Sequence, residues 1–439
     1  MKSQCAIVLF RNDLRLHDHE ALCRAHEGAE TVLHVYCIDP RMFAKTSLGF
    51  EKTGYFRARF LMESLQALRS ALRACGSELL VQHGKPEEVI PELVRTYGAS
   101  KVFAHKEVAQ EEVQVEAALE TALLRQGVPL KLYWGATLFH IEDLPMPVHA
   151  LPDIFTHFRK QVEKSTEVRA QFSIPSRLTS PPVPDPGVIP ATCELGLEAK
   201  EEDIRAVWPF KGGEKAALER LQDYFWQKDC LRIYKDTRDG LLGADYSSKL
   251  SPWLALGCIS PRYIYDQVQQ YERERKKNES TYWLIFELIW RDYFRFVAKK
   301  YGSAIFHKGG IRQTENNGTQ NWSLFDTWRE GKTGYAFVDA NMRELAATGY
   351  MSNRGRQNVA SFLVRDLGLD WRMGAEYFES LLLDYDVCSN WGNWNYVAGV
   401  GNDPRENRYF NVVSQGKRYD PRGEYVRTWL SEEDMRQKI

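Results

Sequence analysis

Short apolar runs alternate with amphipathic stretches over the first 135 residues of the chain. Five of these runs are rich in β-branched residues and are typical of buried strands: 5–10, 31–38, 79–83, 101–105 and 130–133. Three stretches between them repeat apolar residues at helical spacing: 54–75, 87–97 and 110–126. Strands that alternate with helices predict a doubly wound parallel sheet, so we expect an α/β domain here. No G-x-G-x-x-G follows the first run, and the common type of dinucleotide site is therefore not indicated.

The rest of the chain follows a different pattern. Residues 173–190 hold six prolines, a composition that prevents regular structure and predicts a linker over the surface. From residue 213 to about residue 429 nearly every stretch has helical spacing: 214–226, 252–256, 261–274, 282–300, 334–348, 353–367 and 372–383. We therefore expect three parts, which are an α/β domain over 1–135, an interdomain linker over 136–212 and a larger all-α domain over 213–430.

Composition and charge exclude several broad classes of protein. Of the 439 residues, 44% are hydrophobic and 27% are charged, which is typical of a folded globular chain. The 58 basic and 59 acidic side chains nearly cancel, so whole-chain charge indicates neither a nucleic-acid nor a membrane partner. No apolar run is long enough for a membrane helix, and the first 22 residues resemble neither a signal nor a transit peptide, so we expect a cytoplasmic protein.

Cysteine, histidine and tryptophan are distributed unevenly. The eight cysteines are scattered without C-x-x-C spacing or a Cys/His cluster, so we expect free thiols and no metal site. Nine of the ten histidines precede residue 160, whereas eleven of the twelve tryptophans follow residue 200. The later half therefore has little imidazole for acid–base catalysis and many large rings.

Two segments of the later half carry candidate chemistry with an ordinary alternative. The run D-Y-S-S-K-L-S-P-W at 245–253 places hydroxyls and a lysine before a proline that can open a helix, which suits a phosphate site or a plain serine cap. In the helix that follows residue 282, Glu287 and Arg291 share one face beside Trp290, which suits a functional pair or an ion pair next to a core stripe. Between 287 and 356 the local net charge is +4, a modest basic face for nucleic acid.

The third segment is the most informative. It contains N-R-G-R-Q-N at 353–358, D-Y-D-V-C-S-N-W-G-N-W-N-Y at 384–396 and G-V-G-N-D-P-R-E-N-R-Y-F-N at 399–411. These runs are dense in amides, aromatic rings and turn-forming residues and contain few aliphatic side chains. Polar groups that converge among large rings are typical of a pocket for a planar heteroaromatic ligand.

These runs resemble the photolyase/cryptochrome superfamily. The run G-V-G-N-D-P-R-E-N-R-Y-F-N and the earlier S-S-K-L-S-P-W-L-A-L-G resemble its DASH cryptochrome branch, and the resemblance extends to the opening L-F-R-N-D-L-R-L-H-D. It covers nearly the whole chain. It implies that the α/β domain binds an antenna pigment and that the helical domain binds FAD and DNA.

By this resemblance FAD is held non-covalently in the helical domain. The residues that match the family's diphosphate-binding stretch are Tyr234, Ser247, Ser248, Lys249, Leu250 and Ser251. The residues that match the surroundings of the isoalloxazine, adenine and sugar are Asn353, Arg356, Asp384 and Asp386, with Arg356 and Asp384 as a family ion pair. Glu287 and Arg291 match the helix that passes between flavin and DNA. Asn390 matches the residue that faces flavin N5. An amide can form a hydrogen bond there but cannot titrate, so it offers N5 no proton, which is consistent with an anionic reduced flavin.

The resemblance also implies an electron relay and a light-driven reaction. Trp394, Trp371 and Trp322 match the family's relay tryptophans, and core packing is the alternative for each ring. In the family's reaction, excited reduced FAD donates an electron to a cyclobutane pyrimidine dimer, the ring splits and the electron returns. Glu287 would contact the damaged base, and burial against Trp290 and the flavin should raise the pKa of its carboxyl.

The substrate follows from the same comparison of residues. A dimer must be flipped into the pocket, which costs less in a single strand. Tyr396 stands where double-strand repair enzymes place a tryptophan, so with Trp290 and Asn353 it forms a smaller substrate site, and we expect a preference for single-stranded DNA. Repair of (6-4) photoproducts uses a histidine near the flavin, and the matching helix start here has Asn353 and Gln357 instead.

An antenna pigment is also expected. Glu107, which follows Lys106, matches a position that contacts 5,10-methenyltetrahydrofolate in related proteins, and an exposed acid at a helix start is the alternative. The sequence therefore predicts an FAD-dependent DASH cryptochrome that splits cyclobutane dimers in single-stranded DNA with blue light. A photoreceptor that signals through a protein partner without repair is the main alternative. A dark oxidoreductase is a third, but the chain lacks a nicotinamide motif and a recognisable acid–base pair.

Overall fold

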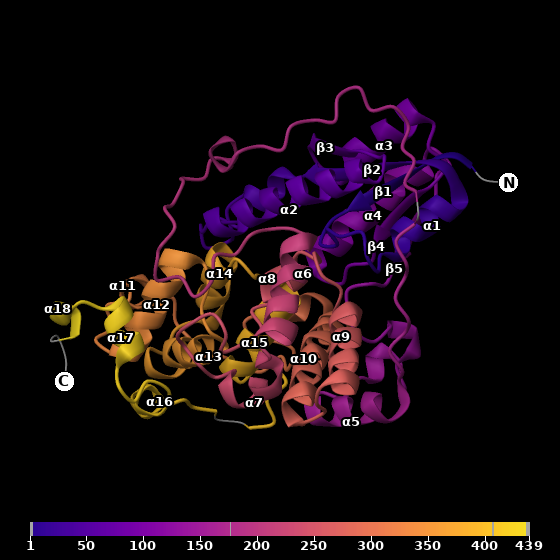
Figure 1. Ribbon diagram of the computed structural model, residues 1–439. Helices are drawn as coiled ribbons and strands as arrows, with labels where there is room; N and C mark the ends of the chain where they lie inside the picture. Colours follow the sequence, from indigo (N-terminus) through magenta and orange to yellow (C-terminus); the bar gives the residue numbers. More distant parts are fainter. Residues whose placement is uncertain (1–2, 176, 406–407, 436–439) are drawn as a thin grey trace.

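A five-stranded parallel sheet forms the centre of the N-terminal part of the computed structural model, which describes residues 3–175, 177–405 and 408–435 (Figure 1). The strand order is β3-β2-β1-β4-β5, and each pair of neighbouring strands is parallel. The strands are β1 (Ser3–Phe10), β2 (Ala29–Ile38), β3 (Leu79–His83), β4 (Val102–His105) and β5 (Leu130–Tyr133). The predicted doubly wound sheet is confirmed.

Helices cover both faces of this sheet. Ile7 and Leu9 of β1 belong to one hydrophobic cluster, and Val8 and Phe10 belong to another, because successive side chains of a strand point to opposite faces. Helices α3 (Pro86–Tyr97) and α4 (Gln110–Leu124) pack into the first cluster, and α1 (Glu20–Gly28) and α2 (Tyr55–Ala74) pack into the second. The second cluster continues into the helical part, so one core serves both domains.

The C-terminal part is helical, as predicted. Its helices are α6 (Glu214–Gln222), α7 (Tyr234–Thr237), α8 (Ser251–Ala255), α9 (Pro261–Glu274), α10 (Glu279–Tyr301), α11 (Trp322–Arg329), α12 (Ala336–Thr348), α13 (Asn353–Ser361), α14 (Trp371–Leu381), α15 (Val387–Ala398), α16 (Val412–Tyr419), α17 (Glu424–Trp429) and α18 (Glu432–Met435). Helices α6 and α13 continue into the π-helical turns η5 (Asp223–Gln227) and η8 (Phe362–Asp366). Short 3-10 turns connect other elements: η1 (Pro40–Phe43), η2 (Ile141–Asp143), η3 (Val148–Ala150), η4 (Thr192–Leu195), η6 (Cys230–Ile233) and η7 (Gly302–Phe306).

The segment 136–212, expected as a linker, is more ordered than its prolines indicate. It contains α5 (Phe155–Ser165), which packs beside the helical part, and then passes over the outer side of the sheet (Figure 1). There the N–H of Val81 donates to the carbonyl of Pro186 at 2.9 Å, and the Arg69 guanidinium donates to the same carbonyl at 2.7 Å. Hydrogen bonds to β3 and α2 therefore fix the stretch around Pro186, which forms no helix or strand of its own.

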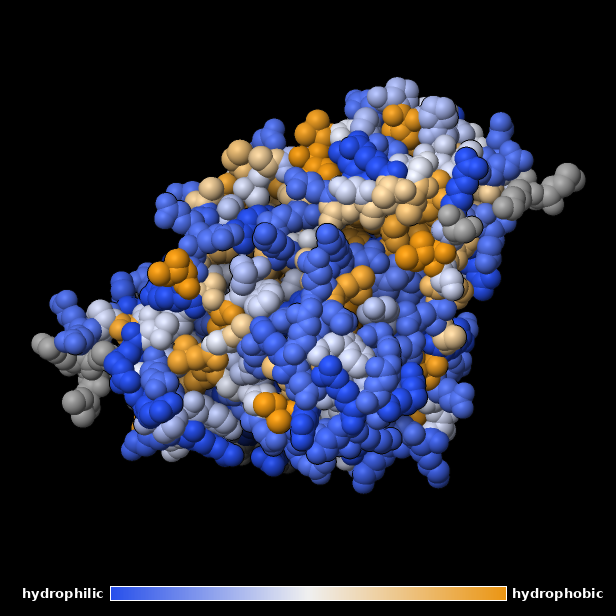
Figure 2. All heavy atoms as spheres, viewed as in Figure 1, coloured by the Kyte–Doolittle hydropathy of each residue, from blue (hydrophilic) through white to orange (hydrophobic). Residues whose placement is uncertain are grey.

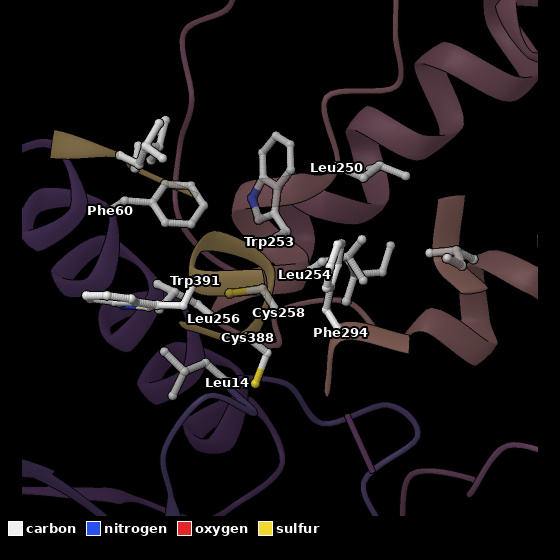
Figure 3. Close-up of a cluster of buried hydrophobic side chains, with 14 of the residues drawn as sticks. Leu14, Phe60, Leu250, Trp253, Leu254, Leu256, Cys258, Phe294, Cys388 and Trp391 are labelled. Atoms are coloured by element: carbon white, nitrogen blue, oxygen red, sulfur yellow. The ribbon is translucent and has the colours of Figure 1, made fainter. Parts of the chain in front are cut away.

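A buried cluster joins the two domains. Figure 3 shows Leu14 and Phe60 of the α/β part facing Trp253, Phe294 and Trp391 of the helical part. The Phe60 and Trp253 rings meet nearly edge-on, with centroids 5.9 Å apart. Because apolar burial is shared across the junction, the domains are expected to unfold together.

Hydrophilic residues cover most of the helical part on the face seen in Figure 2, and the hydrophobic residues there are scattered. Within the described residues, no helix combines the length and the apolar character needed to cross a bilayer.

Candidate functional site

A cavity lies among α13, α14 and α15, and its empty space, mouth included, is about 590 Å³. Its walls combine polar side chains with aromatic and aliphatic ones. The lining residues are Asn353, Arg356, Gln357, Ala360, Phe378, Leu382, Asp384, Tyr385, Asp386, Ser389, Asn390, Asn393, Trp394 and Val397. The structure thus brings together five of the residues that the resemblance assigned to the flavin surroundings, Asn353, Arg356, Asp384, Asp386 and Asn390, with Trp394, which it assigned to the electron relay.

Arg356 and Asp384 form the ion pair that the resemblance implied. One guanidinium nitrogen of Arg356, Nη2, donates to both carboxylate oxygens of Asp384 at 2.9 Å, and the Ser251 hydroxyl donates to Asp384 Oδ2 at 2.6 Å. Burial tends to lower the pKa of Arg356, but the Asp384 carboxylate outweighs it and raises that pKa. Asp384 therefore joins the cavity wall to the serine-rich run that precedes α8.

Asp386 is held by two arginines of α10. Its carboxylate caps α15 by accepting the Ser389 N–H at 2.8 Å, and it lies 4.0 Å from Arg291 Nη2 and 3.7 Å from Arg295 Nη1. Burial alone would raise the pKa of Asp386. The two guanidinium groups outweigh this effect, so the pKa is lower than usual and the carboxylate stays charged. Arg291 also donates to the carbonyls of Ala136 and Leu254, so it links the cavity to the segment after β5.

The amide of Asn390 has a fixed orientation. Its Nδ2 donates to the carbonyl of Ala375 in α14 at 3.0 Å. No donor among the described residues binds its Oδ1, and Asn390 lines the cavity. An acceptor is therefore available for a ligand N–H.

The serine-rich run differs in one respect from the expected phosphate site. Lys249 adopts a left-handed backbone (φ 60°) and is only 2% exposed. Its ammonium lies 2.9 Å from the centroid of the Tyr246 ring and donates to the Ser247 hydroxyl at 3.3 Å. Burial lowers the pKa of Lys249 well below its usual range. The ammonium is thus turned into the protein, and Lys249 offers a ligand its backbone N–H. The next residue, Leu250, is buried, and Tyr234 on α7 is also buried.

Glu287 has a partner that sequence reasoning missed. The half-buried Glu287 carboxylate forms an ion pair with Arg238, which directly follows α7. Burial raises the pKa of Glu287, as expected, and Arg238 opposes that rise. Glu287 lies one helical turn before Arg291 on α10, outside the set of residues that line the cavity.

Trp290 and Tyr396, which the sequence assigned to the substrate site, are in ring contact. Their rings lie edge-to-face with centroids 6.1 Å apart. Phe155 of α5 stacks on Trp290 at 3.6 Å, so the segment expected as a linker supports this pair of rings. Arg408 Nη2 donates to the Tyr396 hydroxyl at 2.7 Å, and the guanidinium lies 4.9 Å from the centroid of the Tyr396 ring. The planar Arg408 guanidinium therefore adds to the surface that the smaller tyrosine ring offers. Sequence reasoning did not identify this arginine.

Trp394 and Trp322 lie at the buried and the exposed end of the predicted relay, but the ring contacts between them do not pass through Trp371. Trp394 is buried and Trp322 is 41% exposed. Trp371 meets Trp391 at 5.6 Å, and no ring contact among the described residues joins it to Trp394 or Trp322. Instead Trp394 meets Trp328 at 6.5 Å, Trp328 meets Phe325 at 5.5 Å, and Phe325 meets Trp322 at 5.7 Å. This row of rings runs continuously from the cavity to the surface.

The predicted antenna residues lie at the domain junction. Glu107 is buried and ion-paired with Arg295, so the alternative of an exposed acid at a helix start is wrong. Lys106 pairs with Glu116 of α4. Because Arg295 also approaches Asp386, a row of alternating charges connects Glu107 to the cavity wall.

One cluster of metal-ligand residue types occurs among the described residues, where the sequence indicated none. Asp13, His19 and His105 are buried together, with His19 Nε2 at 2.9 Å from Asp13 Oδ2. His19 Nδ1 accepts the Leu22 N–H. The contact between His19 Nε2 and Asp13 Oδ2 is close but does not have hydrogen-bond geometry, so the three side chains form a buried cluster of polar contacts.

Comparison with known proteins agrees with this geometry. The model of a family described as DNA photolyase matches residues 6–184, and one described as the FAD binding domain of DNA photolyase matches residues 283–438. A cryptochrome DASH from Gloeobacter violaceus is 56% identical over 432 residues, which cover 98% of this chain and 86% of that protein. A cryptochrome DASH from Arabidopsis thaliana, described as chloroplastic/mitochondrial, is 54% identical over 430 residues, which cover 97% of this chain and 75% of that protein.

Solved structures agree as well. The crystal structure of a Synechocystis cryptochrome superposes with a TM-score of 0.93 at 53% identity, covering 98% of this chain and 89% of that one. A class III photolyase from Agrobacterium tumefaciens superposes with a TM-score of 0.84 at 30% identity, covering 98% and 87% of the two chains. The chain therefore belongs to the photolyase/cryptochrome family, within its cryptochrome DASH branch.

Proposed function

We propose that this protein uses blue light and bound FAD to split cyclobutane pyrimidine dimers, preferably in single-stranded DNA. The observation that carries the proposal is the position of Glu287. Its half-buried carboxyl, with a raised pKa, lies one helical turn from Arg291, which in turn approaches Asp386 in the cavity wall. A carboxyl poised beside a flavin cavity is what contact with a damaged base requires.

The residues of the cavity fit FAD. The Asn390 amide oxygen, which no donor among the described residues binds, suits the flavin ring N–H, and Arg356 with Asp384 supplies a fixed polar edge beside it. The Ser247–Ser251 stretch would take the diphosphate, with Ser251 tied to Asp384. FAD supplies light absorption and the transferred electron, and the protein supplies orientation and a site from which water is excluded.

The strand preference is proposed from the Trp290–Tyr396 wall. A flipped dimer would stack on these rings, and Asn353 at the cavity edge would hydrogen-bond it. Tyr396 offers less area than a tryptophan, so less stacking energy offsets the cost of opening a duplex. A single strand avoids most of that cost.

An antenna is proposed for the domain junction. 5,10-Methenyltetrahydrofolate would contact Lys106 and Glu107, from which Arg295 leads to the cavity wall. We also propose the cytoplasm as the compartment, since all eight cysteines are free thiols, as expected in a reducing environment.

The test is illumination of purified, reduced protein with dimer-containing oligonucleotides, single- and double-stranded, at equal salt. We expect dimer loss chiefly from the single strand, and Glu287→Ala should reduce splitting more than DNA binding. The matched control is Glu279→Ala, which removes another carboxylate from the same helix, paired with Lys235. If the flavin responds to light but dimers persist in both substrates, the repair proposal is wrong and the photoreceptor alternative is favoured.

A further inference from the structure

A buried arginine organises the serine-rich run from behind. Arg220 of α6 is 1% exposed, and its guanidinium donates to two backbone carbonyls of this run and to that of Ala244, directly before it. The distances are 2.9 Å from Nη2 to Ala244 O, 3.2 Å from Nη2 to Ser247 O and 3.0 Å from Nε to Ser248 O. Its Nη1 donates to carboxylate oxygens of Asp223 at 2.8 Å and Asp245 at 3.0 Å. One side chain therefore fixes the direction of three peptide groups.

The opposite side of these peptides carries backbone N–H groups. In a trans peptide the N–H points away from the C=O, so the N–H groups of Ser248 and Lys249 point away from Arg220. Neither donates a hydrogen bond to an acceptor among the described residues. Because Lys249 is left-handed (φ 60°), the successive N–H groups can converge on one point, as they do in backbone sites that bind anions.

The surroundings of Arg220 make this arrangement rigid. The Trp208 ring, from the segment between the domains, lies 4.4 Å from the guanidinium carbon, and the Tyr224 ring lies 5.1 Å from it. Asp223 and Asp245 balance the buried charge, and Lys228 binds both of these carboxylates from the outside. A planar fork with five donors matches this set of acceptors, whereas the point charge of a lysine could serve one or two of them.

We propose that Arg220 is a positioning residue for FAD: it holds residues 244–248 so that the backbone N–H groups of Ser248 and Lys249 bind the diphosphate. This inference rests on FAD binding, which the proposed function also uses, but not on DNA repair. It also accounts for the inward position of the Lys249 ammonium, since the backbone supplies the donors that the lysine side chain does not.

The test compares two flavins that differ in the diphosphate. Full-length protein stripped of flavin is titrated with FAD and with riboflavin, which lacks the phosphates, and binding is followed by quenching of flavin fluorescence. We expect Arg220→Lys to weaken FAD binding roughly tenfold or more, and to leave riboflavin affinity within about twofold of the wild type. A purely structural role would weaken both flavins equally.

The matched control is Arg69→Lys. Arg69 also donates to backbone carbonyls, those of Leu79, Pro186 and Gly187, but in the α/β domain. The Arg69→Lys substitution should lower the melting temperature of the protein without changing its affinity for FAD. Asp245→Asn, at a half-exposed site, provides a milder variant should Arg220→Lys not fold, and it should weaken FAD in preference to riboflavin.

Equal loss of FAD and riboflavin, or unchanged FAD affinity, would overturn the proposal for Arg220. These outcomes are separate from failure of the proposed function, because a wild-type protein that binds FAD but repairs no dimer leaves the role of Arg220 intact.

Discussion

Arg238 and Glu287, which lie 49 residues apart, form a half-buried ion pair between the end of α7 and the middle of α10. Burial raises the pKa of Glu287, and Arg238 limits that rise. The protonation of this carboxyl is therefore set by two opposing effects that can be separated by substitution.

Arg238→Gln should move the titration of Glu287 to higher pH, because burial remains while the stabilising cation is removed. The measurement is infrared titration of the carboxylic acid band, assigned by its loss in Glu287→Gln. Lys235→Gln is the control, since Lys235 pairs with Glu279 instead. An unchanged midpoint in Arg238→Gln would show that the ion pair does not control this carboxyl.

A second prediction concerns the order of rings between the cavity and the surface. Trp394 is in ring contact with Trp328, and Trp371 is in contact with Trp391. If hopping follows ring contact, Trp328→Phe should slow photoreduction of bound flavin at least as much as Trp371→Phe. Trp394→Phe should slow it most, because this ring lines the cavity.

The measurement is the rate of flavin bleaching under blue light, with flavin content determined first for each variant. Trp429→Phe is the control, since Trp429 is buried in the separate cluster around α17. Normal photoreduction in Trp328→Phe, together with slow photoreduction in Trp371→Phe, would favour the order that the resemblance implied.

The sequence predicted the sheet from local patterns, and it predicted the cavity residues through the family resemblance. Alternating apolar runs specify β1 to β5, and the runs that carry Arg356, Asp384 and Asn390 are long and unusual in composition. Helix α15 was not predicted, because its sequence V-C-S-N-W-G-N-W-N-Y-V-A has asparagines and a glycine with low helix propensity. Its stability comes from packing against α10 and α14, which a local pattern does not reveal.

Ion pairs between residues distant in sequence were the second feature that the sequence did not predict. In the sequence, Arg220 and Arg238 resemble ordinary helix-surface charges, and only the fold brings Asp245 and Glu287 to them. The interior position of Lys249 was missed for a related reason. A basic residue among serines suits a phosphate, but the left-handed backbone at Lys249 directs the side chain toward Tyr246. That conformation is set by contacts such as those of Arg220, outside the run itself.

A third prediction concerns stability and pH. Burial raises the pKa of Glu344 on α12 from 4.5 to about 7, and the Tyr425 hydroxyl donates to its Oε2 at 2.6 Å. Below pH 4.5 the carboxyl is protonated in both the folded and the unfolded state. Between pH 4.5 and 7 the folded state binds more protons, so the free energy of unfolding falls as pH rises, by on the order of 3 kcal/mol at most.

Glu344→Gln should remove this contribution and flatten the pH dependence of stability between about pH 4.5 and pH 7. The measurement is urea unfolding of the variant and the wild type at several pH values. Glu201→Gln, at an exposed position, should follow the wild type. A variant with the wild-type slope would assign the pH dependence to other buried carboxyls, such as Asp292, whose pKa burial also raises to about 7.

The last prediction tests the proposed cause of single-strand preference. Tyr396→Trp enlarges the ring that meets Trp290, and additional stacking of about 0.5–1.5 kcal/mol would favour the flipped dimer roughly two- to tenfold. Because the gain offsets the cost of opening a duplex, the ratio of double- to single-strand splitting should rise. Tyr396→Phe separates the effect of size from loss of the hydrogen bond with Arg408. It should leave the ratio near that of the wild type, since the ring area is unchanged. If Tyr396→Phe raises the ratio as much as Tyr396→Trp does, the Arg408 contact controls strand preference and ring size does not.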